Sequence, residues 1–276
     1  MSVSILILTL NEEVNLAECL HSVKWSDDIV VLDSFSTDRT VKIAEEMGAR
    51  VVQRRFDNWS AHQNWALEEI RFSHPWVFYL DADERMTEEL KEELLTVAND
   101  ESRTSVAYYC GRRNMFMGRW IKHAMPPSMI MRFFRPPFVR FQRLVNPVPA
   151  IDGAYGYLQG MLVHYNFSKG IAEWIEKHNR YSSLEALEGM KLIHQRSTNE
   201  PGLWAADRAL RRQALKNLSF RLPGRPLIKF CYLYLWQRGW LDGMQGFTYC
   251  VLQSFYEYMI VLKMRELGRQ KSGLPL

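Results

Sequence analysis

The chain has 276 residues, and its 47% hydrophobic and 24% charged content is that of a folded globular protein, which excludes a disordered or fibrous one. Its net charge is only +4, so the composition gives no reason to expect a nucleic-acid-binding protein. The four cysteines lie far apart with no Cys-x-x-Cys pair, which argues against a zinc site or a disulfide framework and fits a reducing cytoplasm.

The first hundred residues alternate between short apolar runs and segments with helical periodicity. The runs expected to form strands are Val3–Leu10, Asp28–Leu32, Val51–Val52 and Trp76–Leu80. The helices expected after them cover residues 14–23, 41–47, 61–71 and 87–97. This alternation predicts a parallel α/β sheet with crossover helices. We expect no signal peptide, because no basic residue precedes the first apolar run.

Polar side chains follow three of these strands, where each strand ends. They are Thr9, Asn11 and Glu12; Asp33, Ser34, Ser36 and Asp38; and Asp81 and Asp83. Because the carboxyl ends of parallel strands meet at one edge of a sheet, we expect a ligand site there. Two aspartates one residue apart repel each other unless a cation compensates them, and Mg²⁺ also takes substrate phosphates. The alternative is that Asp81 and Asp83 form an acidic cap for the helix that begins near Thr87.

The stretch from residue 105 to residue 164 alternates strand-like runs with loops. Strands are expected over Val106–Cys110, Met129–Phe134 and Gly156–His164. The basic and aromatic segment Arg112–Trp120 is either a surface loop or the floor of an acceptor pocket. The two prolines of Val145–Pro149 exclude a central strand, so this segment is a shaped loop near the site or a surface turn. A lone histidine at a strand end, such as His164, is more often structural than catalytic.

From Ser168 onwards the pattern is helical and increasingly basic. Helices are expected over residues 171–181 and Leu203–Leu218, with apolar runs at Leu227–Trp236 and Phe247–Leu262. Eight Lys or Arg and no Asp or Glu occur between Arg208 and Arg238. Neither apolar run reaches the ~18 residues of a spanning helix. Basic charge beside aromatic residues favours a helix lying in a membrane interface, and the alternative is a hairpin packed on its own domain or on a second subunit.

Three short motifs carry a resemblance to a known family. They are Ile7–Glu13, a strand with an Asn-Glu turn; Asp33–Asp38, with Phe35 where the family has glycine; and Tyr79–Glu84, with an Asp-x-Asp pattern. In order and spacing they resemble the family 2 inverting glycosyltransferases of the GT-A fold. The chain is most similar to the bacterial lipopolysaccharide-core and exopolysaccharide glucosyltransferases, in which a helical segment like Arg238–Gly243 follows the catalytic domain.

The resemblance implies a GT-A domain over residues 1–168, which is a Rossmann-like nucleotide-sugar-binding fold with a mainly parallel sheet, and a helical region over 169–276. The residues implied to hold the nucleotide are Thr9, Asn11, Glu12, Asp33, Ser34 and Asp81. Asp33 would contact the base, and Asp81 the ribose or a metal-bound water. Asp83 would coordinate Mg²⁺ or Mn²⁺ that bridges the diphosphate. The chemistry agrees, because a leaving nucleoside diphosphate needs its charge neutralised by a Lewis acid.

Two departures from the family's pattern concern a cation and the catalytic base. Where many relatives have Gln-Lys-Asn or Gln-Arg-Asn, the chain has His62–Asn64, which lacks a cation. Where many have His-Glu, whose glutamate is the usual candidate base, the chain has Val145–Pro149 with no carboxylate. An inverting displacement needs a base for the proton of the acceptor hydroxyl. The two candidates are Asp152, which is the nearest carboxylate in the sequence, and Glu84.

We therefore expect a metal-dependent glycosyltransferase that moves a sugar from a nucleotide donor, a UDP-hexose, to a lipid-linked or lipopolysaccharide-type acceptor. It would act as a peripheral protein on the cytoplasmic face of a membrane, with no nucleic acid as partner; a homo-oligomer is left open. One rival is a sugar nucleotidyltransferase, although the glycine-rich opening loop of that class is missing at Thr9–Glu12. The other is a non-catalytic nucleotide-binding membrane adaptor, which the missing His-Glu pair leaves open.

Overall fold

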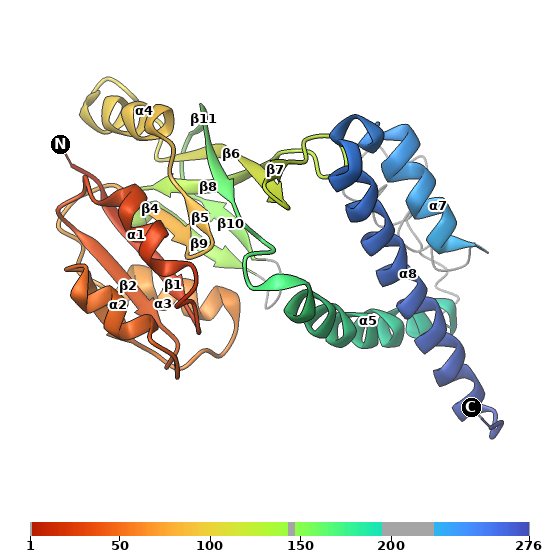
Figure 1. The fold of residues 1–276 in the computed structure, drawn as a ribbon. Coiled ribbons are helices and arrows are strands. Elements are labelled where there is room, and N and C mark those ends of the chain that lie inside the picture. Colours follow the sequence, from red (N-terminus) through yellow and green to blue (C-terminus); the bar gives the residue numbers. More distant parts are fainter. Residues whose placement is uncertain (1, 143–146, 195–223, 276) are drawn as a thin grey trace. The chain divides into compact units, whose positions relative to one another are not determined.

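The computed structural model of the chain describes residues 2–142, 147–194 and 224–275. The chain divides into two compact units (Figure 1). The sheet unit contains Met1–Trp120 and Pro126–Ser168, and the helical unit contains Ile121–Met125 and Lys169–Leu276. The short Ile121–Met125 segment therefore belongs with the helices, although the sequence places it within the first expected domain. The expected helix over Leu203–Leu218 and residues 143–146 lie outside the described residues.

The first half of the sheet unit has the predicted alternation. Its strands are β1 (Ser4–Thr9), β2 (Ile29–Asp33), β3 (Arg50–Gln53) and β4 (Val77–Asp81). Its helices are α1 (Leu16–Val23), α2 (Thr40–Glu46), α3 (Trp59–Glu69) and α4 (Glu88–Asn99). The four strands are parallel in the order β3-β2-β1-β4. The mainly parallel α/β fold expected from the sequence is confirmed.

The second half extends this sheet with mixed pairing: β8 is antiparallel to β4 and β6, β11 is parallel to β6, and β5 is antiparallel to β11. Its strands are β8 (Ser128–Phe134), β6 (Ala107–Phe116), β11 (Tyr155–His164) and the short β5 (Glu84–Arg85), in that order beyond β4. The two-residue β7 (Arg119–Trp120) pairs with the end of β6. Arg112–Trp120, expected as a loop, is therefore mostly a β-hairpin that turns at Met117 and Gly118. The long strand continues because Cys110, Asn114 and Phe116 are buried.

A separate two-stranded sheet follows β8. A short 3₁₀ turn over Pro136–Phe138 leads into β9 (Val139–Gln142), which pairs with β10 (Val148–Ile151). Pro149 thus lies in a strand, but in one of a two-stranded ribbon, where a missing N–H is tolerated. The side chain of Asn64 in α3 holds this ribbon, because it accepts from the Phe141 N–H (2.7 Å) and donates to the Phe141 carbonyl (2.9 Å).

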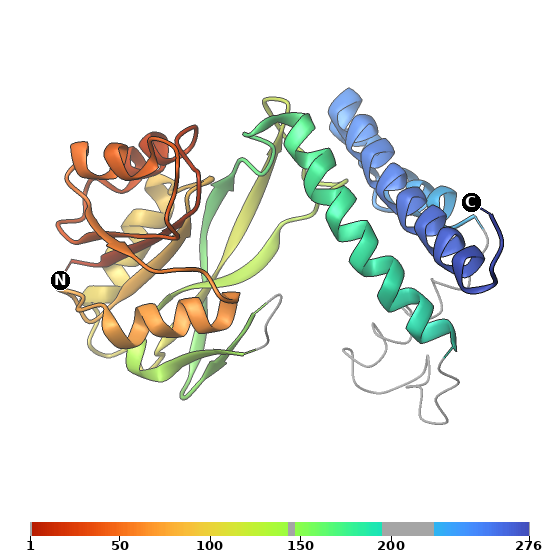
Figure 2. The ribbon, with the colours of Figure 1, turned by 90° about the horizontal axis from the view of Figure 1, so that it is seen from below.

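The central strands are buried on both faces, which explains their continuous apolar sequences. In β1, Ile5 and Ile7 belong to a core with α1, α2 and α4, whereas Leu6 and Leu8 belong to a core with α3. Figure 2 shows the sheet between α1 and α2 on one side and α3 on the other. With both faces covered by helices, the edge at the carboxyl ends of the strands is left to carry polar residues.

The helical unit is built on two long helices. Its elements are α5 (Gly170–His194), α7 (Arg225–Cys231), a π-helical turn η2 (Tyr232–Trp236), a 3₁₀ turn η3 (Gly239–Asp242) and α8 (Gly243–Lys271). Ala186 of α5 packs against Ile260 and Met264 of α8. Phe247 of α8 contacts the rings of Phe230 and Tyr234 from α7 and η2. Among the helices that the structure describes, none has the length and apolar character needed to cross a bilayer.

Helix α4 of the sheet unit lies directly against β11 at Gly160. A Cβ on Gly160 would lie 2.5 Å from the Cα of Leu90, so only glycine fits there without a shift of the helix. The Glu93 carboxylate of α4 accepts the backbone N–H groups of Gln159 (2.9 Å) and Gly160 (2.8 Å). This close contact fixes the strand that carries His164 at its far end.

Replacing Gly160 with alanine should destabilise the sheet unit by about 1–3 kcal/mol, which is the usual cost of extra volume in a packed site. Urea unfolding followed by circular dichroism measures it. Gly268→Ala in α8 is the control, because its Cβ would meet nothing nearer than a Met190 methyl carbon at 3.9 Å. Alanine is the better helix former, so this control should be neutral or stabilising. An unchanged urea midpoint for Gly160→Ala would show that α4 shifts to make room for the added methyl group at little cost in stability.

Candidate active site

Three strand ends meet at one edge of the sheet unit. In the strand register, Thr9 of β1 lies opposite Asp33 of β2, and Leu8 lies opposite Asp81 of β4. After Asp81 the chain turns, and Glu84 of β5 pairs with His164, the last residue of β11. The predicted convergence of the polar residues after β1, β2 and β4 is confirmed by this register, and β11 joins it from much later in the chain.

Asp81 is held by a buried arginine and a tyrosine. Its carboxylate forms an ion pair with Arg132 of β8, which is itself buried, and its Oδ1 accepts the Tyr79 hydroxyl at 2.7 Å. Burial raises the pKa of Tyr79, and the Asp81 charge raises it further, so the hydroxyl stays protonated and donates a hydrogen bond to Asp81. The Arg132 guanidinium also lies over the Tyr79 ring, 4.1 Å from its centre. Asp81 is thus part of a fixed network.

Glu84 belongs to the same network. Its Oε2 accepts the Asp81 N–H at 3.1 Å, while its Oε1 lies 3.0 Å from Arg132 and 3.4 Å from Arg112. Burial raises the pKa of Glu84, and the charge of Arg132 acts in the opposite direction. The residue is 0% exposed. In this conformation the carboxylate has no exposed surface to offer an acceptor hydroxyl, so the structure gives Glu84 no support as the base and this role stays a prediction.

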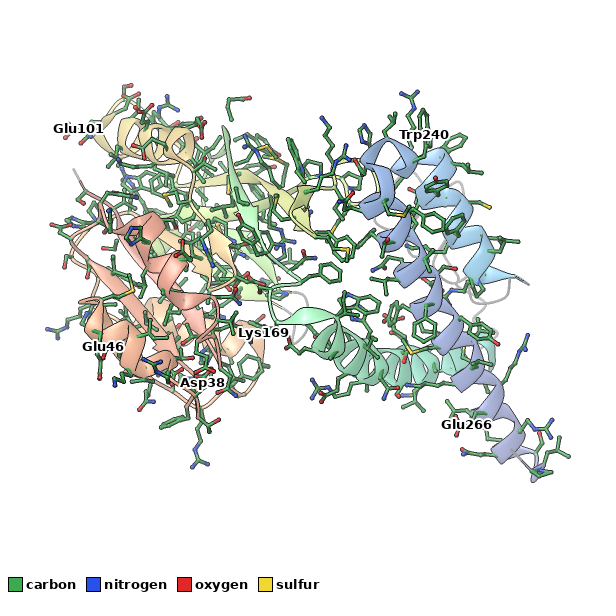
Figure 3. The ribbon with its side chains drawn as sticks, viewed as in Figure 1. Asp38, Glu46, Glu101, Lys169, Trp240 and Glu266 are labelled. Atoms are coloured by element: carbon green, nitrogen blue, oxygen red, sulfur yellow. The ribbon has the colours of Figure 1, made fainter. Side chains whose placement is uncertain are left out.

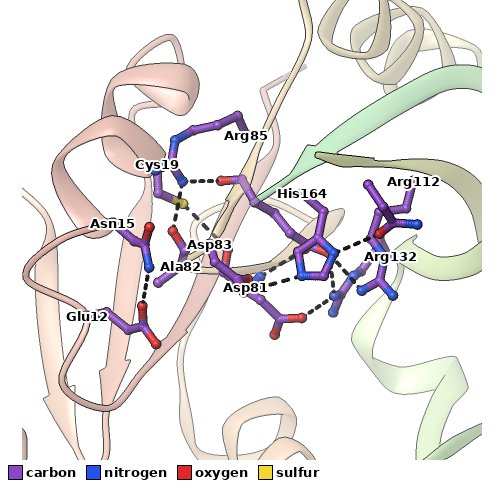
Figure 4. Close-up of polar contacts among 12 residues, drawn as sticks. Glu12, Asn15, Cys19, Asp81, Ala82, Asp83, Arg85, Arg112, Arg132 and His164 are labelled. Carbon is purple, nitrogen blue, oxygen red and sulfur yellow. Dashed lines mark hydrogen bonds and ion pairs between the residues drawn. The ribbon is translucent and has the colours of Figure 1, made fainter. Parts of the chain in front are cut away.

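Asp83 faces His164 across the turn (Figure 4). Its Oδ2 lies 3.3 Å from Nε2 of the imidazole, and the Tyr165 N–H donates to its carbonyl at 2.8 Å. On the other side of the ring, Nδ1 lies 2.9 Å from Oδ1 of Asn114 in β6. An amide oxygen only accepts, so Nδ1 donates to Asn114, and Nε2 faces the carboxylate either as a second N–H donor or as a lone pair. A lone pair that faces a carboxylate calls for a proton or a metal cation between them.

The loops after β1 and β2 are joined by hydrogen bonds. The Asn11 side chain accepts the Thr37 N–H at 2.8 Å, and the Asn11 N–H donates to the Ser36 hydroxyl at 2.8 Å. The Glu12 N–H donates to the Thr40 hydroxyl at 2.7 Å. Asn11 has a φ of 54°, in the left-handed region that asparagine tolerates better than most residues. These two proposed nucleotide residues therefore position one loop against the other.

Asp33 is fully buried and saturated with donors. It accepts the hydroxyl groups of Thr9 and Ser36, the Ser36 N–H at 2.9 Å and the Gln53 amide at 3.0 Å. An ionised carboxylate has about four acceptor sites, so in this conformation its oxygens are taken. The structure gives Asp33 the task of shaping the loop, and its contact with a nucleotide base stays a prediction.

An arginine lies beside the His62–Asn64 segment, which has no positively charged residue of its own. Arg54, which follows β3, lies 2.9 Å from Nδ1 of His62, and Nε2 of that ring lies 3.4 Å from the Ser34 hydroxyl. Burial lowers the pKa of His62, and the Arg54 charge lowers it further, so the ring is neutral. Because Arg54 donates to Nδ1, the proton is on Nε2 and points to Ser34. Arg54 also pairs with Asp57 at 2.8 Å.

Asp152 lies at the opposite edge of the sheet. Because β8 is antiparallel to β4 and β6, the first residues of β4, β6 and β11 lie together, away from the carboxyl ends. Asp152 immediately follows β10 and lies three residues before β11 begins at Tyr155. From Tyr155 to His164 this strand covers roughly 30 Å at its usual rise per residue. The prediction of Asp152 as the base was therefore wrong, since closeness in sequence to the missing His-Glu pair does not bring it to the site.

Four residues of the site were missed or undervalued in the sequence. They are Arg112 and Asn114 of β6, Arg132 of β8 and His164 of β11. A signal existed for Arg132, which is the one charge in an otherwise apolar strand and so needs a buried partner. For Asn114 and His164 no local signal exists, because their partners come from strands far away in the sequence.

Residues 4–162 match the sequence model of glycosyl transferase family 2, and this span is more than half of the chain. The chain belongs to glycosyl transferase family 2. The resemblance inferred from the three motifs is confirmed, and the protein is a glycosyltransferase.

Relatives of this family 2 glycosyltransferase align over nearly its whole length. An uncharacterized glycosyltransferase of Rickettsia typhi is 26% identical over 96% of this chain and 87% of its own. The lipopolysaccharide core biosynthesis glycosyltransferase LpsC of Rhizobium meliloti is also 26% identical, over 95% of this chain and 92% of its own. The crystal structure of S. aureus TarS 1-349 covers 99% of this chain and 92% of that chain, with 13% identity and a TM-score of 0.45.

Proposed function

We propose that this glycosyltransferase uses a divalent cation, Mg²⁺ or Mn²⁺, to transfer a sugar from a UDP-hexose, with inversion, to a lipid-linked or lipopolysaccharide-type acceptor. The observation that carries the metal is the approach of Asp83 Oδ2 to His164 Nε2 at 3.3 Å. The name of the Rhizobium meliloti relative, LpsC, supports the acceptor class. The UDP-hexose rests on the motifs shared with glucosyltransferases.

The residues at this turn fit a cation. Within the described residues, no three His, Cys, Asp or Glu side chains gather as a complete metal site. A cation of this kind is commonly held by one or two protein groups and completed by substrate phosphates and water. Asn114 fixes the His164 ring, as outer partners of metal-binding histidines do. When bound, the metal would neutralise the charge that develops on the leaving diphosphate.

The chain's own residues divide the remaining tasks. Asp83 and His164 hold the cation, and the pairing of Asp81 with Arg132 keeps the turn in place. Asn11, Glu12, Asp33 and Ser34 form the rim that receives the nucleotide, with Asn11 and Asp33 acting through the loop they fix. The proposal assigns no base, because Glu84 is buried and Asp152 lies at the other edge. We place the enzyme on the cytoplasmic face of a membrane, where a lipid-linked acceptor is available.

Removing divalent metal with EDTA should abolish transfer from a UDP-hexose, and Mn²⁺ should restore it. In the His164→Ala variant the Mn²⁺ concentration for half-maximal rate should rise about tenfold or more, since even the outer partners of metal ligands are worth 10–100-fold. Electron paramagnetic resonance of free Mn²⁺ with UDP present measures binding without turnover. His74→Ala is the control, because His74 pairs with Asp27 at 2.7 Å, before β4 begins. Full activity after chelation, or unchanged Mn²⁺ binding in His164→Ala, would contradict the metal site.

A further inference from the structure

The connection between α7 and α8 exposes an unusual amount of apolar surface. We call residues Tyr232–Met244 the tip. Its exposed apolar side chains are Tyr232, Leu235, Trp236, Trp240, Leu241 and Met244. Trp236 is 81% exposed and Met244 is 73% exposed. Figure 3 labels Trp240 at one end of α8 and Glu266 towards the other. Exposed tryptophans are rare on a soluble surface without a partner, so this cluster indicates a contact site.

The tip is a fixed structure. A Cβ on Gly246 would lie 2.1 Å from the Gly239 carbonyl oxygen, so α8 and the η3 turn touch through glycine backbone. Arg238 has a left-handed φ of 60° that reverses the chain. The buried Asp242 accepts the N–H groups of His123 (2.9 Å) and Ala124 (2.8 Å), and lies 2.8 Å from the His123 ring. The apolar side chains are therefore exposed on a rigid turn, and their exposure does not come from fraying at the end of a helix.

The exposed charge at the tip is positive. Between Arg225 and Tyr256 the sequence contains one acidic residue, Asp242, and that carboxylate is buried against N–H donors. Arg238 is exposed within the tip, and Lys229 lies one turn before it. Exposed aromatic side chains beside basic ones are the composition of segments that lie in the headgroup region of a membrane.

The positive charge of the tip also disfavours two other partners, a second copy of the chain and the segment over residues 195–223. A two-fold contact between copies would place the same surface on both sides, and so bring Arg238 near its own copy with no carboxylate to compensate it. The segment over residues 195–223 carries six Lys or Arg against two acidic residues, so its sequence does not complement a basic surface either. An anionic surface is the partner whose charge and polarity match the tip.

We propose that the tip inserts Trp236, Trp240 and Met244 into the headgroup region of an anionic bilayer and thereby anchors the enzyme. The inference deepens the proposed function, because it supplies the surface on which a lipid-linked acceptor is met. The membrane contact expected from the sequence covered Leu227–Leu276, and the proposal narrows it to the tip.

Co-flotation of the full chain with vesicles of phosphatidylcholine, with and without phosphatidylglycerol, tests the proposal. The full chain should float with the anionic vesicles at low salt and less at high salt. The Trp236→Ser/Trp240→Ser variant should lose about tenfold or more of this binding, because each indole contributes buried apolar area. Arg238→Asn, which suits the left-handed φ, should lose about fivefold on anionic vesicles only, the equivalent of ~1 kcal/mol per basic residue.

The control is Leu184→Ser/Leu187→Ser, which removes two exposed apolar side chains of α5 and should bind vesicles like the parent. Flotation of Trp236→Ser/Trp240→Ser equal to that of the parent would overturn the proposal. So would a parent chain that ignores vesicles but forms a dimer in the ultracentrifuge that this variant lacks. Hydrolysis of UDP-hexose in solution should be the same in parent and variant. If the parent floats but turns over no donor, the proposed function fails while the membrane contact stands.

Discussion

Replacing Asp83 with alanine should lower the rate of sugar transfer by about 100-fold or more, the effect of losing charge stabilisation at the leaving group. The alanine variant leaves His164 as the one side chain of the pair, so Mn²⁺ binding with UDP should weaken in parallel. Initial rates with a UDP-hexose at saturating Mn²⁺ measure the first effect, and electron paramagnetic resonance measures the second. Fold should be unaffected, because Asp83 lies in a turn and the hydrogen bond it accepts from Tyr165 uses its carbonyl.

The matched control is Asp100→Ala. Asp100 follows α4, and its carboxylate pairs with Arg103 at 3.0 Å on the surface. Losing such a surface pair costs little, so transfer should be unchanged. The Asp83→Asn variant separates charge from shape, since it keeps the size of the side chain and removes the negative charge. Near-normal transfer by Asp83→Ala would refute a metal role for this residue.

Replacing Arg132 with methionine should destabilise the sheet unit by about 3–5 kcal/mol, the usual cost of leaving one partner of a buried ion pair uncompensated. Arg132 is buried and serves both Asp81 and Glu84. Methionine keeps the volume, so the loss reports charge and hydrogen bonding more than packing. Urea unfolding measures the change. Arg103→Met on the surface is the control, and an equal loss in both variants would show that charge pairing is not the cause.

The destabilisation by Arg132→Met should be larger at about pH 8 than at about pH 5. Burial already raises the pKa of Glu84, and removing Arg132 removes the charge that opposes this rise. The folded state then binds the Glu84 proton more tightly than the unfolded state, so stability is present at low pH and is lost as pH rises through the folded pKa. Urea midpoints at the two pH values test the sign. A variant that is relatively weaker at the lower pH would exclude Glu84 as the group involved.

The parallel half of the sheet could be predicted because its information is local. Runs such as Val77–Leu80 are apolar on both faces, and the carboxylates after them mark the edge where strands end. The mixed half of the sheet was harder, because Arg112–Trp120 carries charges that look solvent-exposed. In the structure Arg112 pairs with Glu84 of another strand, so a local pattern could not reveal the hairpin.

The residues of the candidate site also divide into those that the sequence pattern reveals and those that it does not. Asp81 and Asp83 could be found from their spacing, whereas the group facing Asp83 comes from a strand that ends about eighty residues later. The base could not be placed, since sequence distance to Asp152 carries no information about which edge of the sheet it reaches. Burial of Glu84 depends on Arg132 and Arg112, whose positions follow from antiparallel pairing and not from the Asp-x-Asp motif.

The bonds between the loops after β1 and β2 have a consequence for donor choice. Asn11, Thr37, Glu12 and Thr40 tie these loops together, and Phe35 is kept at a φ of 60° where the family has glycine. A rim preorganised in this way loses little conformational entropy when a donor arrives. Discrimination between nucleotides would then depend on the shape of a rim that is already formed before the donor binds. Exchanging Phe35 for the family's glycine would therefore reduce the selectivity between donors more than it reduces the rate of transfer.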